Sequence, residues 1–191
     1  PSAMWQDKFM HSKVVKKEVF RNKIINNTYK ALYNAQGNSF LLNEEQISIG
    51  SAPLEATSTY LYTTNGNIQQ ITGRDGITQT ILWGYNHSYP VAQIVNATFP
   101  EVLAAMGINA NDLTAMAGAN SPSSDYLTKI GNLRTNLPKA KISHYTYEPL
   151  MGMKTITDPN GLTIVYEYDS LGRLISAKDN DNNIVKTYTY Q

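Results

Sequence analysis

The chain has 191 residues, which is enough for one domain or two small ones with a sizeable buried core. Its 16 lysine and arginine residues almost balance its 15 aspartate and glutamate residues, so the composition lacks the basic excess of a nucleic-acid-binding domain. It contains no cysteine, which excludes disulfides and thiolate metal sites, and no apolar run as long as a membrane-spanning helix.

The first half of the chain is expected to be rich in strands. Residues 1–12 are interpreted as a cloning remnant followed by an N-terminal arm. Residues 13–96 are predicted to form β-hairpins with degenerate repeats. A basic cluster near their start alternates with apolar residues and is interpreted as the solvated face of a strand or helix. This cluster contains Lys13, Lys16, Lys17, Arg21 and Lys23.

A helical segment is predicted over residues 97–138. Thr98 and Glu101 have the spacing of a capping box, in which each side chain bonds the backbone of the other residue. A later helix is expected to begin with Ser121 as its N-cap and Pro122 as its first residue. Apolar residues recur there at helical spacing.

Residues 139–191 are predicted to form an antiparallel meander. Apolar and polar residues alternate before and after three turns, which are expected at 158–161, 169–173 and 179–183. The predicted fold class is therefore β-rich α+β, with antiparallel hairpin repeats and an inserted helical segment.

One pattern recurs along the chain: a tyrosine, three further residues, a glycine and then a polar residue. Tyr168 to Arg173 and Tyr62 to Asn67 show it, as does Tyr33 to Asn38. Tyr147 to Gly152 is a variant with one extra residue. An acidic turn and a second aromatic strand follow most copies. The positions assigned to the repeat are Tyr62, Gly66, Asp75, Gly76, Tyr147, Gly152, Asp158, Gly161, Tyr166, Tyr168, Asp169, Gly172, Arg173, Asp179, Tyr188 and Tyr190.

A single hairpin cannot bury its apolar face, so neighbouring repeats are expected to stack. The tyrosines then suit the inward or cross-strand face, where the ring adds buried area and the hydroxyl reaches a polar partner. If the repeat is real, Gly66 and Gly172 occupy equivalent turns. Four tyrosines are expected to be buried or paired across strands: Tyr166, Tyr168, Tyr188 and Tyr190.

The stretch Tyr168 to Leu174, with Asp179 and the Tyr188–Tyr190 pair behind it, resembles the YD repeat of bacterial RHS (rearrangement hotspot) proteins. The stretches 82–86 and 133–138 are similar to segments of one bacterial branch of that family. The resemblance extends from Tyr60 to Tyr190 and is weak before Ser58. It is carried by the tyrosine, aspartate and glycine positions of the repeat.

This resemblance implies a structural role. RHS repeats are similar to hairpin units that wind into a hollow shell, which in related toxins can enclose a C-terminal toxin domain. The implied function is a non-catalytic section of such a scaffold in a bacterial surface or secreted protein, packed against further repeats of the parent chain. The few repeats here cannot close a shell alone. Asp158-Pro159 lies inside an ordinary repeat, so no self-cleavage residue is assigned.

Metal and catalytic sites are not supported by the motifs. Asp179, Asp181 and Asn183 match the first ligands of an EF-hand loop, but Ile184 and Tyr190 replace its glycine and closing glutamate. A hairpin turn is the favoured interpretation. The histidines have no ligand spacing among them; they are His11, His87 and His144. No catalytic residue, cofactor or metal is therefore assigned.

Carbohydrate binding is the alternative function. Sugars stack on exposed aromatic rings, and Trp83, Tyr85 and Tyr89 lie close together in the sequence beside Asn86 and His87. An open platform formed by these rings would favour a surface glycan-binding module.

The last predicted strand, 184–190, has one charge and no proline or glycine to protect its edge. Unprotected sheet edges pair with other strands. Self-association through exposed edges is therefore expected.

Overall fold

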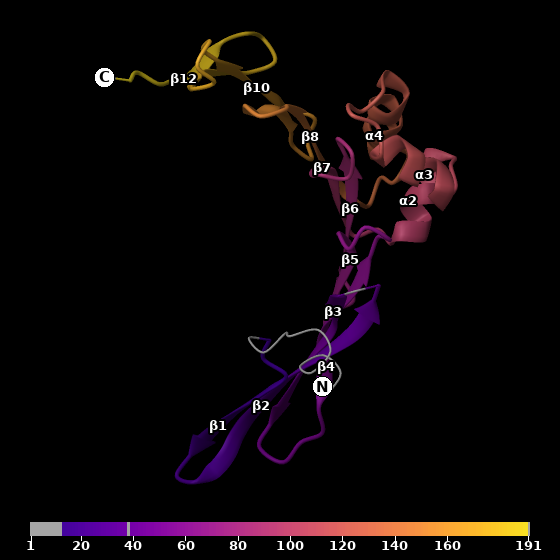
Figure 1. The fold of residues 1–191 in the computed structure, drawn as a ribbon, viewed down its shortest axis with the longest axis vertical. Coiled ribbons are helices and arrows are strands. Elements are labelled where there is room, and N and C mark those ends of the chain that lie inside the picture. Colours follow the sequence, from indigo (N-terminus) through magenta and orange to yellow (C-terminus); the bar gives the residue numbers. More distant parts are fainter. Residues whose placement is uncertain (1–12, 38, 191) are drawn as a thin grey trace. The chain divides into compact units, whose positions relative to one another are not determined.

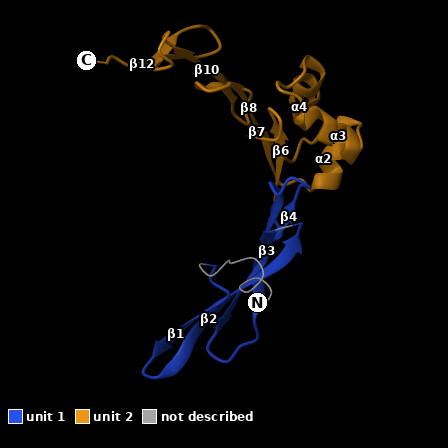
Figure 2. Ribbon diagram, viewed as in Figure 1, with its two compact units in different colours: residues 1–78 blue, residues 79–191 orange. Residues whose placement is uncertain are grey.

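The computed structural model describes residues 13–37 and 39–190 (Figure 1). The predicted arm over residues 1–12 lies outside the described residues. The chain divides into two compact units, residues 1–78 and 79–191 (Figure 2). Antiparallel strands dominate both units, and three helices lie within the described residues, so the predicted β-rich fold class with a helical segment is confirmed.

The first unit is an antiparallel meander in which each strand pairs with the next in sequence. The basic residues of the predicted cluster are exposed on the first strand and its flanks, which confirms a solvated strand face. The buried apolar residues of the described chain all lie beyond this unit. Its strands are β1 (Lys16–Arg21), β2 (Ile24–Gln36), β3 (Ser39–Ile49), β4 (Glu55–Tyr62) and β5 (Ile68–Gly73).

The second unit contains a further antiparallel meander, as predicted for its C-terminal part. The last strand is shorter than expected, because the ladder ends at Thr187. After it, the Tyr188 amide makes one more bond to the Ile175 carbonyl oxygen, at 3.0 Å. The strands are β6 (Thr78–Gly84), β7 (Tyr89–Val95), β8 (Lys141–Glu148), β9 (Gly152–Thr157), β10 (Thr163–Tyr168), β11 (Leu174–Lys178) and β12 (Ile184–Thr187).

Three helices connect β7 to β8: α2 (Phe99–Met106), α3 (Ala110–Ala117) and α4 (Ser124–Asn136). The predicted capping box is present: the Thr98 amide donates to the Glu101 carboxylate at 2.7 Å, and the Thr98 side chain bonds the Glu101 backbone. None of the helices in the described part of the chain is long and apolar enough to cross a membrane.

The predicted start of the last helix is wrong. Ser123, and not Ser121, is the N-cap of α4, and its hydroxyl accepts a hydrogen bond from the Tyr126 amide at 3.2 Å. Pro122 therefore precedes the helix. Tertiary packing explains the choice, because Tyr126 is fully buried and its hydroxyl donates to the Trp83 carbonyl oxygen at 2.9 Å.

The hydrophobic core of the second unit lies where the helices meet β6, β7 and β8 (Figure 1). Full burial of an aliphatic side chain stabilises the fold by about 1.5–3 kcal/mol. The helical segment thus covers the apolar residues of this hairpin region. The largest fully buried side chains are Tyr126, Leu82, Ile94, Ile130, Leu133, Ile142, Val91, Val102 and Thr80.

Candidate functional site: the repeat turns and their tyrosines

Five hairpin turns share one geometry. In the turn that begins at Asp169, the Asp169 amide donates to the Arg173 carbonyl oxygen and the Gly172 amide donates back to the Asp169 carbonyl oxygen, each at 2.9 Å. The same two bonds recur in the turns that begin at Thr63, Gly73, Asp158 and Asp179. This is a three-residue hairpin loop whose last residue is left-handed. The residues in that position are Gly66, Gly76, Gly161, Gly172 and Asn182.

Gly66 and Gly172 therefore occupy equivalent turns, as the repeat requires. Their φ angles are 83° and 75°, values at which a side chain is strained. The pattern at Tyr33 does not form this turn, because Gln36 pairs directly with Ser39 across a shorter loop.

Aspartate side chains brace three of these turns from within. One oxygen of Asp169 accepts from the Leu171 and Arg173 amides, each at 2.9 Å. Asp158 and Asp179 make the same pair of bonds to their own turns, also at 2.9 Å. The backbone amide of Arg173 is the main cause that lowers the pKa of Asp169 below its ordinary value. Each of these carboxylates therefore accepts hydrogen bonds from backbone amides of its own turn.

The Asp179 turn is therefore a hairpin turn, as predicted. Its second carboxylate oxygen accepts from the Asn183 side chain at 3.1 Å, and this bond is the main cause that lowers the pKa of Asp179. Across residues 13–37 and 39–190, no group of three or more histidine, aspartate or glutamate side chains is placed to hold a metal ion.

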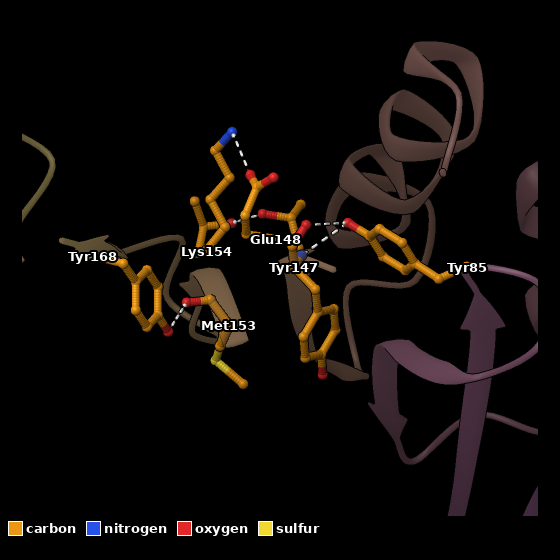
Figure 3. Close-up of polar contacts among 8 residues, drawn as sticks. Tyr85, Tyr147, Glu148, Met153, Lys154 and Tyr168 are labelled. Carbon is orange, nitrogen blue, oxygen red and sulfur yellow. Dashed lines mark hydrogen bonds and ion pairs between the residues drawn. The ribbon is translucent and has the colours of Figure 1, made fainter. Parts of the chain in front are cut away.

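Tyrosine hydroxyls at strand ends bond the backbone of the neighbouring strand. The Tyr168 hydroxyl, at the end of β10, donates to the Met153 carbonyl oxygen on β9 at 2.8 Å (Figure 3). Such a bond stabilises a strand pair by about 1 kcal/mol and leaves a buried acceptor satisfied. Tyr62, at the end of β4, makes the same bond to Leu42 on β3. Tyr190, which follows β12, bonds the Leu174 carbonyl oxygen of β11, and Tyr33, within β2, bonds the Val14 carbonyl oxygen just before β1.

The four tyrosines predicted to serve packing differ in exposure. Tyr166, Tyr168 and Tyr188 are half-buried, and Tyr166 lies opposite Ala177 on the next strand. Tyr190 is 46% exposed, although the Arg173 guanidinium stacks over its ring in a cation–π contact, 4.8 Å from the ring centroid. Arg173 also bonds the Asp169 carboxylate at 2.8 Å. The arginine of the repeat thus links its own turn to the next tyrosine.

Gly152 gives Tyr168 room to cross to β9. A Cβ atom at Gly152 would lie 2.6 Å from the Tyr168 hydroxyl oxygen and 3.2 Å from the ring carbon that bears it. Real Cβ atoms do not approach that closely, so only glycine is compatible with the observed ring position.

Tyr85, Tyr89 and Tyr147 form a second aromatic cluster, which joins the β6–β7 hairpin to β8. Tyr85 is 7% exposed, and its hydroxyl accepts from the Tyr147 amide at 2.8 Å and donates to the Tyr147 carbonyl oxygen at 3.1 Å (Figure 3). Its ring meets the other two edge-on at 5.6 Å, while Tyr89 and Tyr147 stack at 4.8 Å. Trp83 is half-buried. The three tyrosine rings pack on one another.

The turn between β8 and β9 explains the extra residue in the Tyr147 variant. The Met151 amide donates to the Glu148 carbonyl oxygen at 3.0 Å, with Pro149 and Leu150 between them. Leu150 has a φ of 68°, which is the third position of a type II turn and normally requires glycine.

Leu150→Gly is expected to raise the free energy of unfolding by up to about 1 kcal/mol. Removing the side chain relieves about 1–2 kcal/mol of strain in the left-handed region, but glycine loses more conformational entropy on folding, which offsets part of that gain. Leu150 is 100% exposed, so no packing is lost. Urea unfolding measures the change. Leu150→Ala keeps the strain and serves as the control; equal stability of the two variants would contradict the argument.

Arg134 was not assigned a role by sequence reasoning, although it lies in one of the stretches that resemble RHS proteins. Its guanidinium bonds β8 and the turn that follows β9, through His144, Ile142 and Asp158. These contacts cannot be predicted from local sequence patterns, because they join residues that are brought together only by the folding of α4 against the sheet.

Comparisons with known proteins agree with this geometry. The RHS Repeat family matches residues 153–184, which hold β10, β11 and all three of the aspartate turns. The fold is similar to a crystal structure of TcdB2-TccC3-TEV (TM-score 0.54, 10% identity, 92% of this chain and 8% of that chain). It is similar to TcdB2-TccC3 without its hypervariable C-terminal region (TM-score 0.54, 11% identity, 92% and 8%).

A third similar structure is the Tc holotoxin pore of Photorhabdus luminescens (TM-score 0.51, 12% identity, 88% of this chain and 8% of that chain). A search of curated proteins found no match. At these identities the likeness concerns the fold alone, and the chain spans about 8% of the length of the structures that it matches. Residues 153–184 thus form an RHS repeat with the turn geometry described above, and the chain as a whole has the fold of the RHS-containing structures that it resembles.

Proposed function

We propose that the chain is a non-catalytic section of an RHS/YD-repeat scaffold, which packs against further repeats of a larger bacterial surface or secreted protein. The observation that supports this most directly is that the polar side chains of the repeat make hydrogen bonds within the sheet and its turns. The Tyr168 hydroxyl bonds the neighbouring strand, and the Asp169 carboxylate bonds its own turn. These side chains stabilise the sheet, as a scaffold requires.

Tyr168→Phe tests this role. The variant keeps the ring but leaves the Met153 carbonyl oxygen without its donor, so the free energy of unfolding is expected to fall by about 1 kcal/mol. Tyr166→Phe is the matched control, because the Tyr166 hydroxyl has no hydrogen-bond partner among the described residues. Urea unfolding of both variants measures the difference. Equal stability of the two would overturn the assignment of the tyrosine to the scaffold.

Enclosure of a C-terminal toxin by the parent protein is the more specific form of the proposal. It is supported by similarity to TcdB2-TccC3 complexes, one of which lacks a hypervariable C-terminal region. In the full-length parent, the segment after the repeats is expected to resist a protease that digests the same segment when it is expressed alone. Equal digestion in both forms would exclude enclosure.

Glycan binding is the alternative that the aromatic residues suggest. Burial of Tyr85 and stacking of Tyr89 on Tyr147 occupy two of the three candidate rings. A glycan array is therefore expected to give no reproducible signal. A signal abolished by Trp83→Ala would reverse the ranking of the two functions.

Self-association follows from the exposed last strand. All residues of β12 are exposed, with Ile184 and Val185 at 62% and 60%, and Lys186 is the strand's one charge. Within the described residues β12 pairs on one side, with β11. We propose that its other edge pairs with the same strand of a second copy. Light scattering over a concentration series is expected to show dimers; a monomer at high concentration would contradict this.

A further inference from the structure

Arg134 connects the end of α4 to β8 and to the turn that follows β9. One guanidinium nitrogen lies 3.1 Å from Nδ1 of His144 on β8. The other donates to the carbonyl oxygens of Ile142, at 2.9 Å, and Asp158, at 3.0 Å. Three segments of the second unit therefore meet at one cation: α4, β8 and the turn that follows β9.

The contact defines the protonation state of His144. An arginine has donors only and stays charged at any physiological pH. Nδ1 of His144 must therefore accept the hydrogen bond from Arg134, which leaves the imidazole neutral with its proton on Nε2. Both side chains are half-buried.

The arginine is incompletely satisfied. Its Nε is buried and has no hydrogen-bond partner among the described residues. Leaving a buried donor unpaired costs stability, so the other bonds of the guanidinium must offset that cost. Loss of the His144 acceptor would add a second unpaired donor to the same group.

The surroundings offer a protonated His144 no free carboxylate. The strand partners of His144 are Ala92 on β7 and Thr157 on β9, which are both uncharged. The charged groups that face the pair are Arg134 itself and Asp158. Burial lowers the pKa of Arg134, and the Asp158 carboxylate, which is already bonded by its own turn, partly opposes that shift. A second cation here would have no counterion of its own.

We propose that Arg134 and His144 form an acid-sensitive latch, which holds the end of the helical segment against β8 and the first turn of the matched RHS repeat. At neutral pH the latch is closed. On acidification a proton binds Nδ1, so the acceptor is lost and two cations face each other. The guanidinium then turns away and releases the Ile142 and Asp158 carbonyl oxygens. The helical segment loosens from residues 153–184, a conformational response that goes beyond a passive scaffold.

The direction of the pH dependence follows from linkage. Burial, and secondly the Arg134 charge, lower the pKa of His144 below its ordinary value of 6.5. The unfolded chain therefore binds this proton more readily than the native protein. The contribution to the free energy of unfolding is full above about pH 6.5 and is lost as the pH falls from there toward the native pKa. Asp169 and Asp179 do not interfere, because their lowered pKa values lie in a more acid range.

Thermal unfolding at about pH 7.5 and about pH 5.5 tests the latch in the intact chain. Wild type is expected to lose several degrees of Tm on acidification. His144→Gln, whose carboxamide oxygen can still accept from Arg134, is expected to lose less than half as much. His87→Gln is the control and should keep the full loss. An equal loss in wild type and His144→Gln would overturn the proposal.

An NMR titration of the His144 ring provides a measurement that does not depend on a variant folding. In wild type the ring is expected to titrate below about 6.5, and amide hydrogen exchange at the end of α4 should accelerate over the same pH range. Arg134→Met should move the titration upward. The proposal would also be overturned if wild-type His144 titrated at or above the ordinary pKa of 6.5, or if the exchange rates of the α4 amides did not change as His144 is protonated.

Discussion

Leu133→Ala is expected to lower the free energy of unfolding by about 2–5 kcal/mol, because it removes a buried aliphatic side chain and leaves a cavity that the surrounding residues fill only in part. Leu133 is 0% exposed on α4 and belongs to the core that the helices form with the strands. Chemical denaturation followed by circular dichroism measures the loss. The cooperative transition should shift to lower denaturant, since α4 loses one of its three fully buried side chains in the core.

Leu162→Ala is the matched control. Leu162 is the same residue type but is 62% exposed in a turn, so its truncation should change the free energy of unfolding by no more than about 0.5 kcal/mol. If both variants unfold at the same denaturant concentration, the helical segment does not form a stable core with β6, β7 and β8.

Gly152→Ala is expected to cost about 1–3 kcal/mol, as overpacking of a well-filled site does. The new methyl group would lie 2.6 Å from the Tyr168 hydroxyl oxygen, so the ring must move and its bond to Met153 is strained or lost. Denaturant unfolding reports the cost. Because the clash is strongest at the hydroxyl, Tyr168→Phe in the Gly152→Ala background should recover part of the loss.

Gly131→Ala separates the local clash from a general effect of replacing glycine. Gly131 lies inside α4 with open space around its Cα, so alanine there is expected to stabilise the helix by about 1 kcal/mol. Opposite signs at the two glycines would support the geometry. Destabilisation of similar size at both would mean that the contact with Tyr168 is not the cause.

Local chemistry made much of the fold predictable. The turns that begin at Asp158, Asp169 and Asp179 are held by bonds within five consecutive residues, so aspartate and glycine spacing alone identifies them. The capping box at Thr98 and Glu101 is equally local. Alternation of apolar and polar residues indicated the strands for the same reason, since side chains of a strand alternate between two faces.

The contacts that sequence reasoning did not foresee depend on distant residues, and the wrong start predicted for the last helix is one example. Ser121 and Ser123 both have the chemistry of an N-cap, and the buried position of Tyr126 selects Ser123. Tyr85 belongs by sequence to a candidate binding platform, but its hydroxyl bonds the backbone of Tyr147, 62 residues away. No spacing rule relates two residues that meet only through the pairing of β7 with β8.

The sequence by itself determined the class of the fold, its repeat and the turns, because each depends on bonds and side-chain preferences among near neighbours. The tertiary structure decided which face each tyrosine occupies, where α4 begins, and that Arg134 reaches His144. Those contacts form when the helices cover the sheet. Where local preferences allow two conformations of nearly equal free energy, as at the Ser121 and Ser123 N-caps, the one that buries more apolar surface is favoured.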